Sequence, residues 1–166
     1  MRIARRPVLI IESLRLRRRA DWTAAFGAGL AAGAAMALAP VLALDSLALS
    51  ALERRVGALI LGPGVLPPPA TSDLAITVAA VVVHGFLSAA FALPLADAVF
   101  RLEPRAAVPL GGLYGVFLYI LNLHVFTRVF PWFAFLRGPK VFALHVLYGL
   151  VAAYVYGRFE RERLRG

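Results

Sequence analysis

Four long runs of apolar residues dominate the chain, and short segments that carry most of its charges separate them. The runs cover residues 22–44, 74–96, 107–126 and 140–156. Each approaches the roughly 20 residues that an α-helix needs to cross about 30 Å of hydrocarbon. The pattern therefore predicts an all-α polytopic membrane protein, with a four-transmembrane-helix bundle in one domain at residues 22–157.

Two further segments mix apolar and charged residues. Residues 1–21 surround the short apolar group 8–14 with arginines, which fits an interfacial amphipathic helix on lipid headgroups or, equally, a disordered basic tail. Residues 46–61 contain Glu53, Arg54 and Arg55 amid leucines and predict a short helix on the opposite membrane surface. The run Gly62–Pro69 then predicts a rigid loop, because its prolines fix φ and lack an N–H donor.

Aromatic and basic residues flank the predicted spans. Trp22 begins the first run and Trp132 lies in the aromatic segment 127–139, and tryptophan prefers the interface between lipid and water. A basic tail closes the chain at residues 158–166. We expect arginines beside the spans to contact anionic lipid headgroups, namely Arg15, Arg17, Arg18, Arg19 and Arg158.

Composition supports lipid as the solvent of this chain. Of its 166 residues, 61% are hydrophobic and only 16% are charged, whereas soluble domains carry about 25% charged residues. The formal net charge of +9 comes from arginines that cluster beside the spans, so we expect anionic lipid rather than nucleic acid as their partner. The chain has no cysteine, which excludes disulfides, thiolate metal sites and thiol catalysis.

The distribution of basic residues predicts the orientation of the spans. Thirteen of the 18 basic residues lie before the first span, between the second and third, or after the fourth. The other five lie on the opposite side. Because the side richer in arginine and lysine stays in the cytoplasm, we expect a bacterial inner-membrane protein with both termini cytoplasmic.

Small residues recur four positions apart within each span. In lipid, glycine and alanine at this spacing let helix backbones approach closely, where packing rather than apolar burial drives association. Two uses are open: packing inside the chain's own bundle, which we favour because every span has such a stripe, or a dimerisation face. The glycines concerned are Gly29, Gly33, Gly85, Gly111, Gly115 and Gly149.

A few polar side chains lie inside the spans, and we select His84, Asn122, His145 and Tyr119 as a candidate intramembrane cluster. An unpaired polar group in hydrocarbon is costly, so each should have a partner. The cluster could fix helix register, form a proton or substrate path, or bind a b-type haem between His84 and His145. A rise of 1.5 Å per residue places these histidines at depths about 7 Å apart, so we expect no haem or other cofactor.

Two motifs carry a resemblance to a protein family. The loop Leu61–Thr71 reads LGPGVLPPPAT, and the later part of the chain combines Asn122, the run Phe130–Phe133 (FPWF) and His145. In these features the chain resembles a group of small bacterial four-helix membrane proteins, some of which bear a sodium:solute symporter label. The resemblance implies a four-helix membrane fold over about residues 20–157. A chain this short, without an inverted repeat, does not fit a symporter.

No known catalytic motif is present in the sequence. It holds no Ser–His–Asp set, phosphate-binding loop, HExxH motif or paired carboxylates. We therefore expect a non-catalytic protein that packs as an accessory or scaffold subunit against other integral membrane subunits, for example in a respiratory or photosynthetic complex. The alternative is a small carrier, a proton path or a haem-binding redox protein that uses His84 and His145.

Overall fold

The computed structural model describes residues 20–163, and this part of the chain is helical without a strand. Residues 1–19 of the predicted amphipathic segment lie outside the described residues, and so do Arg15, Arg17, Arg18 and Arg19. The long helices are α2 (Trp22–Ala43), α3 (Ser46–Leu61), α4 (Leu74–Val99), α5 (Pro104–Ile120) and α6 (Pro139–Arg163). Short turns are η1 (Pro63–Val65), the π-helical η2 (Leu121–Val125), η3 (Phe126–Arg128) and η4 (Pro131–Leu136).

Four helical segments are long and apolar enough to cross a membrane, as the hydrophobic pattern predicts. They cover Trp22–Leu42, Leu74–Val99, Arg105–Arg128 and Pro139–Glu162. Three of the helices begin at an aspartate whose side chain accepts backbone N–H groups of the first turn: Asp21, Asp45 and Asp73. Such caps satisfy donors that a helix start would otherwise leave without a partner.

The fourth helix differs from the prediction at its end. The apolar run suggests a span that ends near residue 156 and a separate tail, but α6 continues to Arg163. Arginine and glutamate favour the helix, and Arg158 pairs with Glu162 one turn later at 3.7 Å. The charged residues therefore extend the helix beyond the apolar segment.

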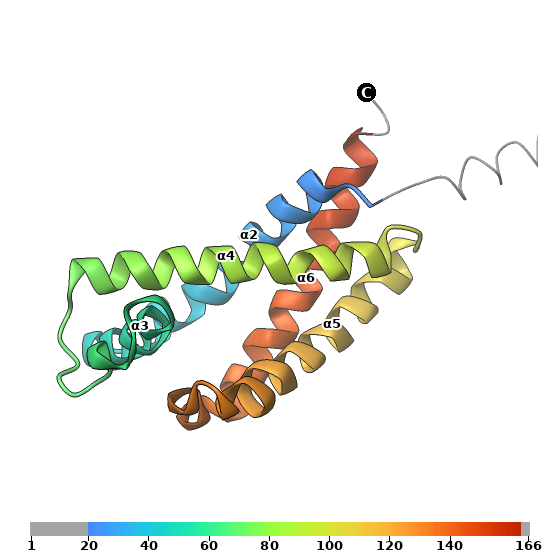
Figure 1. Cartoon of the computed structure of the whole chain (residues 1–166). Helices are drawn as coiled ribbons and strands as arrows, with labels where there is room; N and C mark the ends of the chain where they lie inside the picture. The colour runs from blue at the N-terminus through green and yellow to red at the C-terminus, as the bar shows by residue number, and fades with distance from the viewer. Residues whose placement is uncertain (1–19, 164–166) are drawn as a thin grey trace, which may run out of the picture.

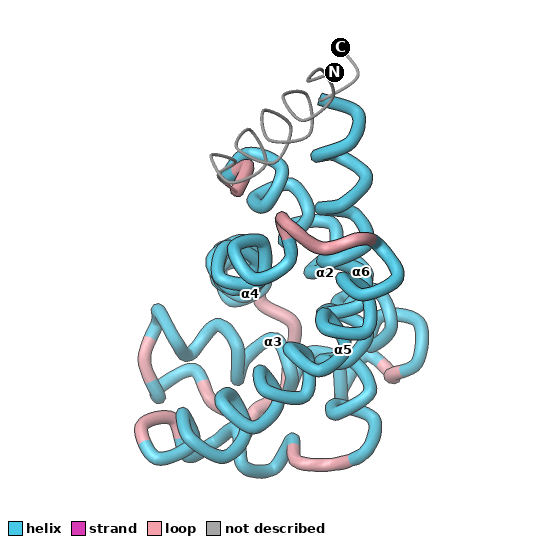
Figure 2. Tube along the Cα trace, turned by 90° about the vertical axis from the view of Figure 1, so that its right-hand side faces the viewer, coloured by secondary structure: helices cyan, strands magenta, loops and turns pink. Residues whose placement is uncertain are grey.

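The helices form two packed pairs joined by α2. Helix α5 packs along α6, α3 packs on α4, and α2 contacts both α4 and α6. Figure 1 shows α4 crossing α2 and α6, with α3 beside its first turns and α5 descending from its last turn. Viewed along α4 in Figure 2, α2 and α6 lie together on one side of it.

The start of the first long helix and the end of the last lie at the same end of the bundle. The backbone N–H of Asp21, before α2, donates to the hydroxyl of Tyr156 near the end of α6, at 3.1 Å. The side chains of Val99, Leu102 and Ala107, around the α4–α5 turn, lie close to the same part of α6. The start of α2, the α4–α5 turn and the end of α6 are therefore at one end of the bundle, with α3 and η1 to η4 toward the other (Figure 1).

Candidate functional site

The first group of polar side chains inside the spans joins α4 to three other helices. His84 on α4 bonds through Nε2 to the carbonyl oxygen of Gly33 on α2, at 2.9 Å. A carbonyl only accepts, so Nε2 carries the proton in this arrangement. The hydroxyl of Tyr148 on α6 donates to Ser88 O at 2.5 Å, and that of Tyr114 on α5 donates to Phe91 O at 2.7 Å. These bonds tie α2, α5 and α6 to α4.

A second polar group lies between α6 and the end of the third span. His145 is buried and donates through Nδ1 to Val141 O at 2.8 Å, which leaves Nε2 as an acceptor in the neutral ring. The amide Nδ2 of Asn122, in η2, approaches that Nε2 at 3.4 Å. The ring of Tyr119 lies edge-on to His145 with centroids 5.7 Å apart, and its hydroxyl accepts from the N–H of Gly138.

The predicted cluster is therefore divided. Asn122, His145 and Tyr119 come together, whereas His84 bonds to α2 and shares no hydrogen bond with them. Both histidine Nε2 atoms already have a protein partner, so a haem between them would have to break both interactions. Among residues 20–163, no three His, Asp or Glu side chains lie close enough to hold a metal ion.

A third polar group, which the sequence analysis did not predict, surrounds Arg137. The helix widens to a π-helix over Leu121–Val125, and Arg137 donates through Nε to the carbonyl of Leu123 at 2.7 Å. It also donates to Thr127 Oγ1 at 2.9 Å, and this hydroxyl donates to Leu123 O. The guanidinium thus compensates for the irregular backbone at the end of the third span.

Four of the six selected glycines lie where two backbones meet, and a fifth, Gly33, lies against side chains of α4. A Cβ atom on Gly111 or Gly149 would collide with the backbone of the other, between α5 and α6. On Gly115 it would meet the backbone of His145, and on Gly29 the backbone of Ser88 on α4. On Gly33 it would meet the side chain of Ser88. These glycines pack inside the bundle, consistent with the use that we favoured.

Gly85 does not fit this pattern. A Cβ atom there would meet only the Leu30 side chain, at an ordinary contact distance of 3.8 Å. Its neighbours on α4, Val81, Val82 and Phe86, are exposed. The expectation that Gly85 brings two helices of this chain together is therefore wrong, because α2 approaches α4 on the adjacent face that holds Ser88 and Ala89.

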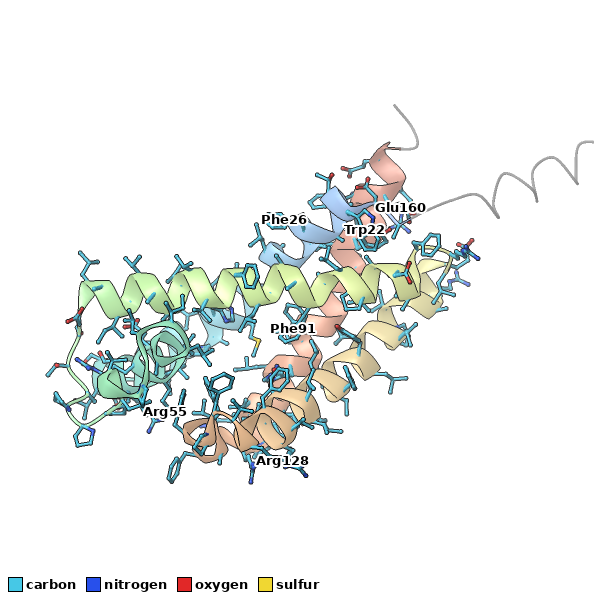
Figure 3. The ribbon with its side chains drawn as sticks, viewed as in Figure 1. Trp22, Phe26, Arg55, Phe91, Arg128 and Glu160 are labelled. Atoms are coloured by element: carbon cyan, nitrogen blue, oxygen red, sulfur yellow. The ribbon has the colours of Figure 1, made fainter. Side chains whose placement is uncertain are left out.

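An apolar surface runs along α2 and α4, which we call the α2–α4 face. On α2 it presents Trp22, Phe26 and Leu30 at intervals of four residues, and on α4 it presents Val78, Val82 and Phe86 at the same spacing, all exposed. A shallow recess lined by Trp22, Leu93, Pro94 and Asp97 continues it toward the helix ends. Figure 3 shows Trp22 and Phe26 on the opposite side of α4 from Phe91.

The remaining selected residues lie near the bundle ends. Trp22 is half exposed on α2, whereas the indole Nε1 of Trp132 donates to Arg55 O on α3 at 3.0 Å. Arg158 is exposed near the end of α6 and pairs with Glu162. In Figure 3, Arg55 and Arg128 lie at the end of the molecule far from Glu160.

Comparison with protein-family models, curated proteins and solved structures gives no match.

Proposed function

We propose that this protein is a non-catalytic subunit that packs, through the α2–α4 face, against a helix of a larger membrane complex such as a respiratory or photosynthetic assembly. We place it in the bacterial cytoplasmic membrane with both termini in the cytoplasm. In the sequence, 13 of the 18 basic residues precede the first span, lie between the second and third, or follow the fourth, and this distribution supports the orientation.

The observation that carries the proposal is that the polar side chains inside the spans form hydrogen bonds within the bundle. His84, Tyr114 and Tyr148 each bond to a backbone carbonyl of a neighbouring helix. In the described residues, no buried side-chain nitrogen or oxygen lacks a hydrogen-bond partner. The polar groups therefore fix helix register, and the chemistry presented outward by the spans is that of a packing surface.

The α2–α4 face suits a transmembrane helix as its partner. Gly85 is a small residue among the larger exposed side chains of Leu30, Val82 and Phe86, and a Cβ atom on it would meet no backbone of another helix, only the Leu30 side chain. A small residue flanked by large ones lets a second helix approach closely, and close approach is the main source of helix affinity in lipid. Binding of a partner helix by such packing requires no charged or catalytic group.

Purification from native membranes tests this proposal. Solubilised in a mild detergent, the tagged protein should migrate with larger membrane polypeptides in a native gel. The Gly85→Leu variant should lose these polypeptides, because a large side chain in place of glycine keeps a second helix from approaching closely, while the variant keeps its own helical content. A wild-type protein that elutes as an isolated monomer from gently solubilised membranes would contradict the proposal.

A further inference from the structure

Helix α3 is amphipathic in the inverse sense, with its polar side toward the protein. Its buried residues include Ser50, Arg54 and Gly57, whereas Leu47 and Ile60 are exposed. An amphipathic helix at the membrane surface normally turns its polar side to water and its apolar side to lipid or protein. The exposed apolar side of α3 is therefore explained by an apolar neighbour.

The polar side chains on the inner face of α3 have partners within the protein. Arg54 is only 8% exposed and donates to Thr71 O at 3.0 Å, Val65 O at 3.1 Å and Thr71 Oγ1 at 3.2 Å. Ser50 bonds to Ser72, and the hydroxyl of Thr77 donates to Glu53. Arg55 folds back onto Ala51 O of its own helix.

These bonds satisfy backbone groups of the proline-rich loop that follows α3. Two of the three acceptors of Arg54 are loop carbonyls, and four prolines, Pro63, Pro67, Pro68 and Pro69, bring no N–H donor to the loop. In a water-poor environment every backbone donor and acceptor must be satisfied internally, so both features lower the cost of placing this loop near hydrocarbon.

The two spans that adjoin α3 in the chain also expose apolar side chains next to it. Leu42 at the end of α2 is 83% exposed and Leu74 at the start of α4 is 81% exposed, and α3 lies between these two positions in the chain and packs on α4. A Cβ atom on Gly57 would meet the Ile76 side chain and backbone, so α3 lies against the first turns of α4.

We propose that α3 is embedded in the membrane at the flank of the bundle, with Leu47, Ile60 and Leu61 in contact with lipid acyl chains of the leaflet on that side. Arg54 acts as the internal clamp that allows this placement, since it holds the loop carbonyls that water would otherwise bind. The proposal is independent of the α2–α4 face, because α3 presents a different surface and needs no partner protein.

The natural lack of cysteine makes a direct test simple. Single-cysteine variants Leu47→Cys and Ile60→Cys are purified and reconstituted into phosphatidylcholine–phosphatidylglycerol vesicles. Glu103→Cys, in the exposed α4–α5 turn, is the control for water, and Leu113→Cys, exposed on α5, is the control for lipid. In the first experiment, the thiol of each reconstituted variant is reacted with a water-soluble maleimide. In the second, each thiol is labelled with bimane, and the labelled protein is then reconstituted with lipids brominated near the middle of the acyl chain.

We expect the α3 thiols to react at least about tenfold more slowly than Glu103→Cys, because the reactive thiolate is disfavoured in hydrocarbon. Bimane at Leu47→Cys and Ile60→Cys should be quenched by brominated lipid as it is at Leu113→Cys. Rapid maleimide reaction would place α3 in water and overturn the proposal. Slow reaction without quenching would overturn it too, since a second copy of the protein would then cover the face.

Discussion

The Tyr148 hydroxyl on α6 donates a hydrogen bond to the backbone carbonyl of Ser88 on α4, across 60 positions of sequence. Three residues further along α4, the carbonyl of Phe91 accepts from Tyr114 on α5. Direct packing of α4 on α5 and α6 is otherwise limited compared with its packing on α2 and α3. The two tyrosines therefore set the position of α4 relative to the α5–α6 pair.

Replacing Tyr148 by phenylalanine should weaken the bundle without unfolding it. The change removes one buried hydrogen bond and keeps the ring, so we expect the free energy of unfolding to fall by about 0.5–1.5 kcal/mol. Denaturation in mixed detergent micelles, followed by circular dichroism, measures it. Tyr154→Phe on the same helix is the matched control, since Tyr154 is exposed. Equal losses in both variants would show that the bond to Ser88 O contributes nothing.

Alanine at Gly149 and at Gly85 should have different effects. The added methyl group at Gly149 collides with the backbone of Gly111, so we expect a loss of about 1–3 kcal/mol in unfolding free energy as α5 and α6 separate. At Gly85 the methyl group has room beside Leu30, so Gly85→Ala should unfold as the wild type does. The same micelle assay decides, and a strong loss at Gly85 would show that it packs inside the bundle.

His145→Ala should destabilise the protein, whereas His124→Ala should not. His145 is buried and bonds to Val141 O and Asn122, while His124 is exposed and contacts only the Tyr119 ring among the described interactions. We expect a loss of about 1–3 kcal/mol in the free energy of unfolding for His145→Ala, measured in the same micelle assay.

An absorption spectrum of the wild type tests the alternative function, haem binding by His84 and His145. A Soret band that disappears in both His84→Ala and His145→Ala would establish haem binding and contradict a purely structural role.

Arg54→Ala should loosen the loop that follows α3, whereas Arg55→Ala should leave it in place. Arg54 donates to two loop carbonyls, while the side chain of Arg55 donates only within its own helix. Removing one partner of a buried polar group typically costs about 1–3 kcal/mol. Limited proteolysis in detergent should cut Arg54→Ala within residues 62–73 faster than wild type or Arg55→Ala. Identical cleavage of the two variants would exclude the clamp.

The spans were predictable because their signal is local. A run of apolar residues of sufficient length requires a helix in lipid, whatever its neighbours, and all four runs were found. The end of α6 was missed because hydropathy marks where a chain leaves the membrane and not where its helix stops. The π-helix at Leu121–Val125 has no local signal either, since its stabilising partner Arg137 lies 14 positions from Leu123.

The pairing of the polar residues was not predictable from their positions alone. Depths derived from a uniform rise treat the helices as parallel rods, yet α4 crosses α2 and α6, and His84 meets Gly33 instead of Asn122 or His145. Gly85 and Gly111 look alike in sequence, both followed by a small residue four positions later. Only the arrangement of the helices shows that Gly111 meets the backbone of another helix, whereas Gly85 meets only the Leu30 side chain.

Site-specific photocrosslinking in native membranes tests the central claim, that the α2–α4 face binds another membrane subunit. A photoreactive amino acid is introduced at Leu30, Val82 or Phe86, and at Leu113 or Phe117 on the exposed side of α5 as controls. We predict a discrete adduct with a different polypeptide from each α2–α4 position and none from the α5 positions. No adduct from the α2–α4 positions, or the same adducts from α5, would contradict the account.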